Sequence, residues 1–130
     1  MDKKPLILII DDEKYVREMI ELKLSVSGFE THEADCGRKG IEAIKELKPD
    51  IVLLDIEMPD MTGVEVLREL RKEGLSDMSK IFLYTGKDLD RADIVEVSRI
   101  MAKEEGAVDL IRKETNLDQV IKILKNCQLY

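Results

Sequence analysis

The chain has 130 residues, of which 44% are hydrophobic and 38% charged, and its net charge is −7. This length and composition are typical of one globular domain, so we expect a single domain over residues 1–130. An acidic chain lacks the basic surface that nucleic-acid binding requires, which excludes direct nucleic-acid contact. The longest clear apolar run, Leu6–Ile10, is too short to span a membrane, so we expect no membrane insertion.

The cysteines, the N-terminus and single side chains allow further predictions about redox state, location and exposure. Cys36 and Cys127 are isolated in the sequence and lack metal-ligand spacing, which predicts reduced thiols. No secretory signal is recognisable after Met1, and a cytoplasmic protein is expected. His32 lies in a polar segment and is expected at the surface. Tyr15 and Tyr84 are expected to pack in the core, with contact to a partner as the alternative.

Five short apolar runs alternate with amphipathic stretches along the chain. The runs are Leu6–Ile10, Phe29–Glu33, Ile51–Leu54, Ile81–Tyr84 and Ala107–Ile111. Each amphipathic stretch carries apolar residues at i, i+3 and i+4 spacing, which predicts a helix with one buried face. In chain order, the predicted faces comprise Val16, Met19, Ile20 and Leu24; Ile41, Ile44 and Leu47; Val64, Leu67 and Leu70; Ile94, Val97 and Met101; and Leu117, Val120, Ile121 and Leu124.

This alternation predicts an α/β fold, a doubly wound five-stranded parallel sheet with helices on both faces. The runs at 6–10 and 51–54 are apolar on both faces and are therefore expected at the centre of the sheet. The runs at 29–33 and 107–111 carry charged residues and are expected at its edges. The strand order 2-1-3-4-5 of flavodoxin-like (βα)5 proteins satisfies both conditions.

Acidic residues follow the first and third predicted strands. Asp11 and Asp12 come directly after the first, and Asp55 comes directly after the third. Because these strands are neighbours in the predicted order, the three carboxylates should converge at one edge of the sheet. Clustered carboxylates repel one another, and Mg²⁺, which prefers oxygen ligands, would relieve that repulsion. The alternative is a solvated acidic rim that only keeps the protein in solution.

The remaining strand ends carry groups that suit phosphate. Thr85 ends the fourth strand and Lys113 follows the fifth. A hydroxyl and an ammonium group facing a metal and a carboxylate would form a phosphoryl-transfer site, with Asp55 as the nucleophile. The connection after Asp55 contains Pro59 and Gly63, and Gly63 is expected to permit a positive φ angle. Thr62 and Glu65 have capping-box spacing, which predicts the start of the third helix.

Four segments carry a resemblance to a known family. They are IIDDE (9–13), LLDIEMPDMTG (53–63), FLYTG (82–86) and GAVDLIRK (106–113), in the family's order and over nearly the whole chain. On these motifs the chain resembles a receiver domain of two-component response regulators, of the stand-alone chemotaxis-regulator type.

The resemblance implies a role for each site residue. Asp55 would accept a phosphoryl group from a histidine of a sensor histidine kinase or phosphotransfer protein, in a Mg²⁺-dependent reaction. Asp11, Asp12, Asp55 and the backbone carbonyl of Glu57 would bind the metal, and Thr85 and Lys113 the phosphoryl group. The face formed by the fourth helix, fifth strand and fifth helix would then rearrange and regulate an unknown protein target. A monomer is expected, with dimerisation on phosphorylation as the alternative.

The sequence departs from the family pattern at several places. Glu114 replaces the usual proline after Lys113, which predicts a trans peptide bond there. Leu110 stands where the family often has a switch aromatic, so the usual aromatic rotation cannot operate. The stretch between Thr85 and Gly106 is about six residues longer than usual. At about 1.5 Å per helical residue, this predicts a fourth helix longer by up to about 9 Å, or a longer loop before that helix. Glu57 and Lys87 are expected either to pair over the site and hinder attacking water, or to remain solvated.

Three classes of function follow from these patterns. The leading hypothesis is a signalling switch that phosphorylates and dephosphorylates only itself and is not otherwise an enzyme. The second is a receiver-fold binding module that is not phosphorylated. The third is a Mg²⁺-dependent aspartyl phosphatase with Glu57 as general acid, for which 130 residues leave no room for a cap.

Overall fold

The strands form one parallel sheet. The computed structural model describes residues 4–86 and 99–127. The strand order is β2-β1-β3-β4-β5, and every neighbouring pair is parallel, which confirms the predicted fold and order. The strands are β1 (Leu6–Ile10), β2 (Glu30–Ala34), β3 (Ile51–Asp55), β4 (Lys80–Thr85) and β5 (Asp109–Arg112).

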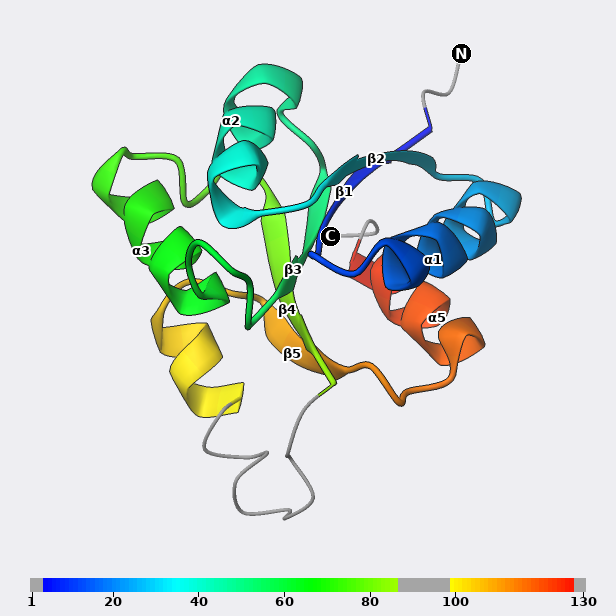
Figure 1. Ribbon diagram of the computed structural model, residues 1–130. Coiled ribbons are helices and arrows are strands. Elements are labelled where there is room, and N and C mark those ends of the chain that lie inside the picture. The colour runs from blue at the N-terminus through cyan, green and yellow to red at the C-terminus, as the bar shows by residue number, and fades with distance from the viewer. Residues whose placement is uncertain (1–3, 87–98, 128–130) are drawn as a thin grey trace.

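Helices cover both faces of the sheet. They are α1 (Lys14–Val26), α2 (Gly37–Leu47), α3 (Gly63–Lys72) and α5 (Leu117–Cys127), and residues 99–104 are also helical. Figure 1 shows α1 and α5 on one face and α2, α3 and the helical turns at 99–104 on the other. Among the described residues, no helix is both long and apolar enough to cross a membrane.

The alternation of side chains along the central strands builds two core layers. In β1, Ile7 and Ile9 pack in the layer that contains the buried residues of α1 and α5. Leu8 and Ile10 pack in the layer that contains those of α2 and α3. A strand buried on both faces is apolar at every position, which explains why the sequence of β1 identified it as central.

The buried faces of the helices differ in part from the prediction. Met19 was expected in the core but is 43% exposed, because the buried face of α1 consists of Arg17, Ile20 and Leu24. Tyr15 was also expected in the core and is exposed. The observed face has i, i+3, i+7 spacing, which fits a helix as well as the spacing of the predicted face does. The sequence pattern did not identify it because arginine is not an apolar residue.

Similar shifts of one or two positions occur elsewhere. In α3 the core residues are Val66, Leu67 and Leu70, and Val64 is only half-buried. Met101 is exposed, whereas its neighbour Ala102 is buried. The other two members of that predicted face, Ile94 and Val97, lie outside the described residues. His32 is exposed on the edge strand β2, as expected.

Candidate functional site

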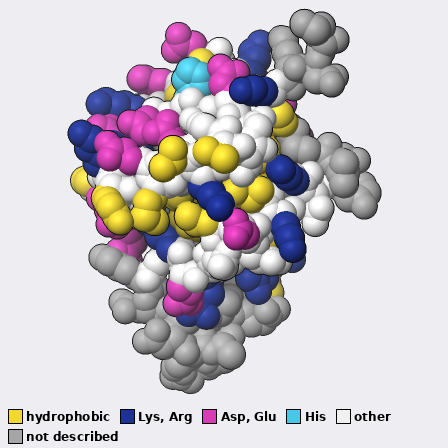
Figure 2. All heavy atoms as spheres, turned by 90° about the vertical axis from the view of Figure 1, so that its right-hand side faces the viewer, with side chains coloured by type: hydrophobic (Ala, Val, Ile, Leu, Met, Phe, Trp, Pro, Cys, Tyr) yellow, Lys and Arg dark blue, Asp and Glu magenta, His cyan; other side chains and the backbone are white. Residues whose placement is uncertain are grey.

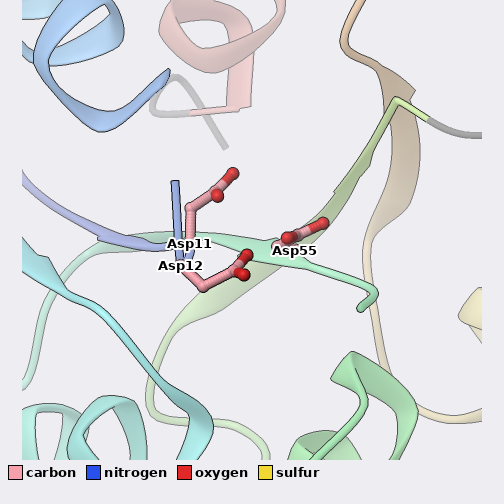
Figure 3. A group of neighbouring side chains, drawn as sticks. All are labelled: Asp11, Asp12 and Asp55. Atoms are coloured by element: carbon pink, nitrogen blue, oxygen red, sulfur yellow. The ribbon is translucent and has the colours of Figure 1, made fainter. Parts of the chain in front are cut away.

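Three carboxylates meet where β1 and β3 end. The two strands pair from Ile7 to Ile10, and Asp11 follows β1 directly, while Asp55 is the last residue of β3. One carboxylate oxygen from each of Asp11, Asp12 and Asp55 lies within 4.8 Å of the other two. Figure 3 shows the three side chains around this edge of the sheet. Asp11 and Asp55 are buried and Asp12 is exposed.

A pocket of about 400 Å³ opens at the same edge. Its lining consists of Asp12, Glu13, Asp55, Glu57, Met58, Pro59, Thr85, Gly86 and Lys113. The residues predicted from four separate strand ends are thus brought together around one space, and Asp11 lies beside it within reach of the other two acids. Thr85 is the last residue of β4, is buried, and is part of the pocket lining.

Asp11 is held by contacts at all of its polar groups. Its backbone N–H donates to the carbonyl of Ala34, and Oδ1 accepts from the backbone N–H of Glu13 at 2.8 Å. Oδ2 forms an ion pair with Lys113 Nζ at 2.7 Å. The carbonyl oxygen accepts from Arg17 Nη1 at 2.7 Å. These contacts restrain the orientation in which Asp11 enters the acidic cluster.

Lys113 supplies the positive charge of the cluster. Its Nζ lies 2.7 Å from Asp11 Oδ2, 3.5 Å from Asp55 Oδ1 and 5.8 Å from the ring centroid of Tyr84. Burial by itself lowers the pKa of this amine, but the hydrogen bond to Asp11 and the charges of Asp55 and Asp11 outweigh it and raise the pKa. Lys113 is therefore a fixed cation at neutral pH. At Gly86 an added Cβ would lie 3.0 Å from Lys113 Cδ, so the glycine leaves room for this side chain.

The electrostatic environment of Asp55 disfavours its charged form. Burial has the largest effect and the negative charge of Asp11 the next largest, and together they raise the pKa of Asp55 from 3.8 to about 6. The positive charge of Lys113 acts in the opposite direction. The side chains of the pocket thus carry more negative charge than Lys113 compensates.

The connection from β3 to α3 has the predicted cap but a different role for its glycine. The Thr62 side chain accepts from the N–H of Glu65, and the Glu65 side chain accepts from the N–H of Thr62, which confirms the capping box. Gly63 has no positive φ angle, contrary to expectation. It is required instead because α3 starts against the end of β3, where an added Cβ would lie 2.6 Å from the Asp55 carbonyl oxygen.

The same connection is fastened to α2. The Asp60 carboxylate accepts hydrogen bonds from the backbone N–H groups of Gly37 and Arg38, both at 2.9 Å. These are the first N–H groups of α2, and helix N-termini favour negative charge. The hydrogen bond from Arg38 is the main reason that the pKa of Asp60 is lowered. Asp60 therefore anchors the segment that forms one side of the pocket.

The departures from the family pattern leave the site intact. The peptide bond between Lys113 and Glu114 is trans, as predicted, and Lys113 still reaches both Asp11 and Asp55. Leu110 is buried at the position of the usual aromatic. Lys87 lies outside the described residues, so the expected pair with Glu57 stays a prediction, as does most of the lengthened stretch.

The donor set fits a hard divalent cation. The cluster offers carboxylate oxygens from three aspartates, and the backbone carbonyl of Glu57 belongs to a residue that lines the same pocket. Oxygen donors of this kind, with room left for water, are what Mg²⁺ prefers, whereas zinc sites use nitrogen and sulfur ligands.

Comparison with known proteins agrees with the motifs and the geometry. The family model described as the response regulator receiver domain matches residues 7–125. The chain belongs to this family. Receiver domains are signalling modules of two-component systems and bind Mg²⁺ at an acidic pocket. Histidine kinases phosphorylate the receiver domains of response regulators.

Curated relatives of this receiver domain are longer proteins. The chain is 36% identical over 120 residues to the regulatory protein AtoC of Escherichia coli and 34% identical over 119 residues to the phosphate regulon transcriptional regulatory protein PhoB of Pseudomonas aeruginosa. Each match covers 92% of this chain, but the chain spans only 24% of AtoC and 49% of PhoB.

Solved structures share the architecture over nearly their whole length. The BeF₃-activated N-terminal receiver domain of RstA from Klebsiella pneumoniae is 29% identical with a TM-score of 0.79, and the match covers 92% of this chain and 95% of that one. TrrA from Thermotoga maritima, in complex with Mg²⁺ and a beryllium fluoride, is 30% identical with a TM-score of 0.75, covering 94% and 97%.

Sequence reasoning missed two residues that support the site. Arg17 and Asp60 both make contacts across sequence separations that no local pattern reveals, six residues to Asp11 and 23 residues to Gly37. A partial signal existed for Arg17, which lies three and seven residues before the core residues Ile20 and Leu24. A charged residue at a core-facing helical position is a hint of a specific partner.

Proposed function

We propose that this receiver domain is a phosphoacceptor signalling switch in which Asp55 receives the phosphoryl group. The observation that carries the proposal is the position of Asp55, a buried carboxylate within 4.8 Å of Asp11 and Asp12 and 3.5 Å from Lys113. A nucleophile at the end of β3, a cation site between the ends of β1 and β3, and a fixed ammonium group after β5 are the parts that phosphoryl transfer needs.

In this proposal the donor is a phosphohistidine on a sensor kinase or phosphotransfer protein. A carboxylate oxygen of Asp55 attacks phosphorus, the P–O bond forms as the P–N bond breaks, and the leaving imidazole takes up a proton. Asp55 must be ionised for this step, and a pKa of about 6 leaves most of it ionised at pH 7. Hydrolysis of the acyl phosphate would return the carboxylate, and the chain has no separate substrate.

The other residues would hold the reacting groups. Asp11, Asp12, Asp55 and the backbone carbonyl of Glu57 would hold Mg²⁺, which supplies neutralisation of the charge that develops on the phosphoryl oxygens. Lys113 would shift its contact from Asp11 and Asp55 to a phosphoryl oxygen as a point positive charge. Thr85, in the pocket lining, would donate a hydrogen bond to the same group.

An apolar stripe on α1 supports the choice of a helical protein donor. It consists of Tyr15, Met19, Leu22 and Val26, at i, i+4, i+7 and i+11, all exposed by 43–79%. Figure 2 shows hydrophobic side chains gathered on the face of the molecule where α1 and α5 lie. Tyr15 follows Asp12 by three residues, so the stripe begins at the pocket and runs away from it. A donor whose helix packs along the stripe would bring its histidine to Asp55.

The output would pass through the helical turns at 99–104 and β5. Arg99 bridges them, since its Nε pairs with Asp109 Oδ1 at 2.8 Å and its Nη2 donates to the Leu110 carbonyl at 3.0 Å. Because Leu110 is aliphatic and buried, this arginine bridge is the contact through which the face would respond. The protein target that binds this face can be identified by capturing partners with the phosphorylated domain.

The test is the intact mass of the protein after incubation with Mg²⁺ and a small acyl phosphate. We expect a gain of one phosphoryl group, lost when EDTA replaces Mg²⁺ and absent in Asp55→Ala. Asp77→Ala, a change at an exposed acid in the α3–β4 connection, is the matched control and should label normally. An unlabelled wild type, under conditions where another receiver domain is labelled, would refute the switch and favour a binding module.

A further inference from the structure

Arg17 is a buried cation beside the acidic cluster. Only 7% of its surface is exposed, and it lies on the core-facing side of α1 with Ile20 and Leu24. Arginine is almost never buried without a partner, because taking a guanidinium group out of water costs several kcal/mol. The contacts that Arg17 makes therefore indicate what its burial serves.

Its principal contact is with the backbone of Asp11. Nη1 donates to the Asp11 carbonyl oxygen at 2.7 Å, a charge-assisted hydrogen bond at the short end of the usual range. Nε lies 3.5 Å from Glu33 Oε2, close enough for an ion pair, although Nε makes no hydrogen bond. The Glu33 side chain is 40% exposed, so this ion pair is partly solvated, whereas the hydrogen bond from Nη1 to Asp11 is buried.

The Asp11 carbonyl needs such a partner because it lies beyond the sheet. The pairing of β1 with both β2 and β3 ends at Ile10. The carbonyl of the following peptide group, that of Asp11, therefore takes no part in the hydrogen bonding between these strands. That peptide joins Asp11 to Asp12. Its orientation therefore determines how the two side chains project toward Asp55.

We propose that Arg17 is a positioning residue for the cation site, acting through the Asp11 carbonyl. Holding this carbonyl fixes the turn from which the Asp11 and Asp12 carboxylates leave β1. Mg²⁺ demands nearly ideal octahedral geometry and tolerates little displacement of its ligands, so the turn must be rigid for tight binding. This inference rests on the cation site of the proposed function, but it concerns binding and not phosphoryl transfer.

The alternative is that Arg17 only stabilises the fold. Both roles predict that losing the guanidinium lowers Tm, so stability alone does not separate them. Only the positioning role predicts weaker cation binding by protein that is still folded. Loss of a partner that orients a metal ligand typically weakens metal binding by about 10–100-fold.

The test is a calorimetric titration with MgCl₂ of the wild type, Arg17→Met and Arg71→Met. Methionine keeps much of the apolar stem while removing the guanidinium. Arg71 is the matched control because its Nη2 also donates to a backbone carbonyl, that of Glu104 at 2.9 Å, on α3. We expect the Kd for Mg²⁺ to rise about tenfold or more in Arg17→Met and to stay within about twofold of wild type in Arg71→Met.

Arg17→Lys covers the case in which Arg17→Met does not fold. Its single flexible ammonium cannot reproduce the fixed geometry of the guanidinium fork, so its Kd should also rise. A wild-type Kd in either variant, folded by circular dichroism at the titration temperature, would overturn the positioning role while leaving the switch untouched. A wild type that binds no Mg²⁺ would remove the cation site itself and the proposed function with it.

Discussion

The acidic pocket and the apolar stripe on α1 are adjacent, yet they depart from the usual distribution of side chains in opposite ways. The pocket buries the charged Asp11 and Asp55, whereas the stripe exposes apolar side chains such as Leu22 and Val26. Each arrangement lowers the stability of the isolated domain, since buried like charges repel and exposed apolar side chains forgo burial.

The difference between them lies in how each region is supported. The pocket is enclosed by fixed groups, with Asp11 bonded at its N–H, carbonyl and carboxylate. The stripe is one face of a regular helix whose opposite face does the packing. Chemistry needs atoms placed in three dimensions, whereas a helical binding surface needs only a period of 3.6 residues. Three variants test this contrast.

The largest effect is expected from Asp55→Asn, which removes the repulsion in the metal-free pocket. The pKa of Asp55 is 3.8 unperturbed and about 6 in the fold, so the native state binds this proton more tightly than the unfolded state. Wild-type stability is therefore lost as pH rises from about 4 to about 6, by up to about 3 kcal/mol at about 1.36 kcal/mol per pKa unit. The variant lacks this loss.

Urea unfolding in EDTA at pH 7 and pH 4 measures this effect. Asp55→Asn should be more stable than wild type at pH 7, and most of the difference should be gone at pH 4, where the folded wild type holds the proton and the unfolded state, with its pKa of 3.8, holds it in part. Equal stabilities at pH 7 would mean that the pocket carries no electrostatic cost, and the contrast with the stripe would fail.

The next effect is expected from Leu22→Lys in the stripe. A lysine there would place a charge in the proposed helix contact and slow phosphoryl transfer from a phosphorylated histidine kinase that labels the wild type. A loss of about 1.4 kcal/mol in complex stability corresponds to a factor of about ten. Labelling by a small acyl phosphate should not change, because the pocket is untouched.

Val108→Lys is the matched control for the stripe, since Val108 is also an exposed apolar residue but immediately precedes β5. It should accept phosphate from the kinase at the wild-type rate. If both lysine variants slow equally, or if Leu22→Lys has no effect, the stripe is not the donor surface.

The smallest effect is expected from Asp60→Ala, which cuts the link between the pocket wall and α2. Loss of its hydrogen bonds to Gly37 and Arg38 should lower the free energy of unfolding at pH 7 by about 1 kcal/mol, the usual cost of removing a helix cap. Because the pKa of Asp60 is lowered in the fold, its contribution is present above the unperturbed value of 3.8 and is lost as pH falls below it. Chemical unfolding at several pH values, with Asp77→Ala as the control, measures this.

Much of the fold could be predicted because its signals are local. The strands at 6–10 and 51–54 are apolar throughout since both faces are covered, and the alternation of strand and helix leads to a parallel sheet. The convergence of Asp11, Asp12 and Asp55 followed from the strand order, because parallel strands end at the same edge. The capping box at Thr62 followed from spacing alone.

The predictions that failed depended on what lies across from a side chain. Met19 and Tyr15 fit the composition of a buried face, but α1 buries Arg17 together with Ile20 and Leu24, and Arg17 donates a hydrogen bond to the Asp11 carbonyl there. Gly63 was expected to have a positive φ angle, but it does not. Its lack of a Cβ instead lets the start of α3 lie close to the Asp55 carbonyl oxygen.

The sequence by itself determined the elements, their order and the residue types at the strand ends, since periodicity and turn chemistry act over a few neighbouring residues. Only the tertiary structure decided which groups hold the site in place. The contacts of Arg17 with Asp11, of Lys113 with Asp11 and Asp55, and of Asp60 with the start of α2 join different elements. Such contacts form only once the sheet has brought those elements together.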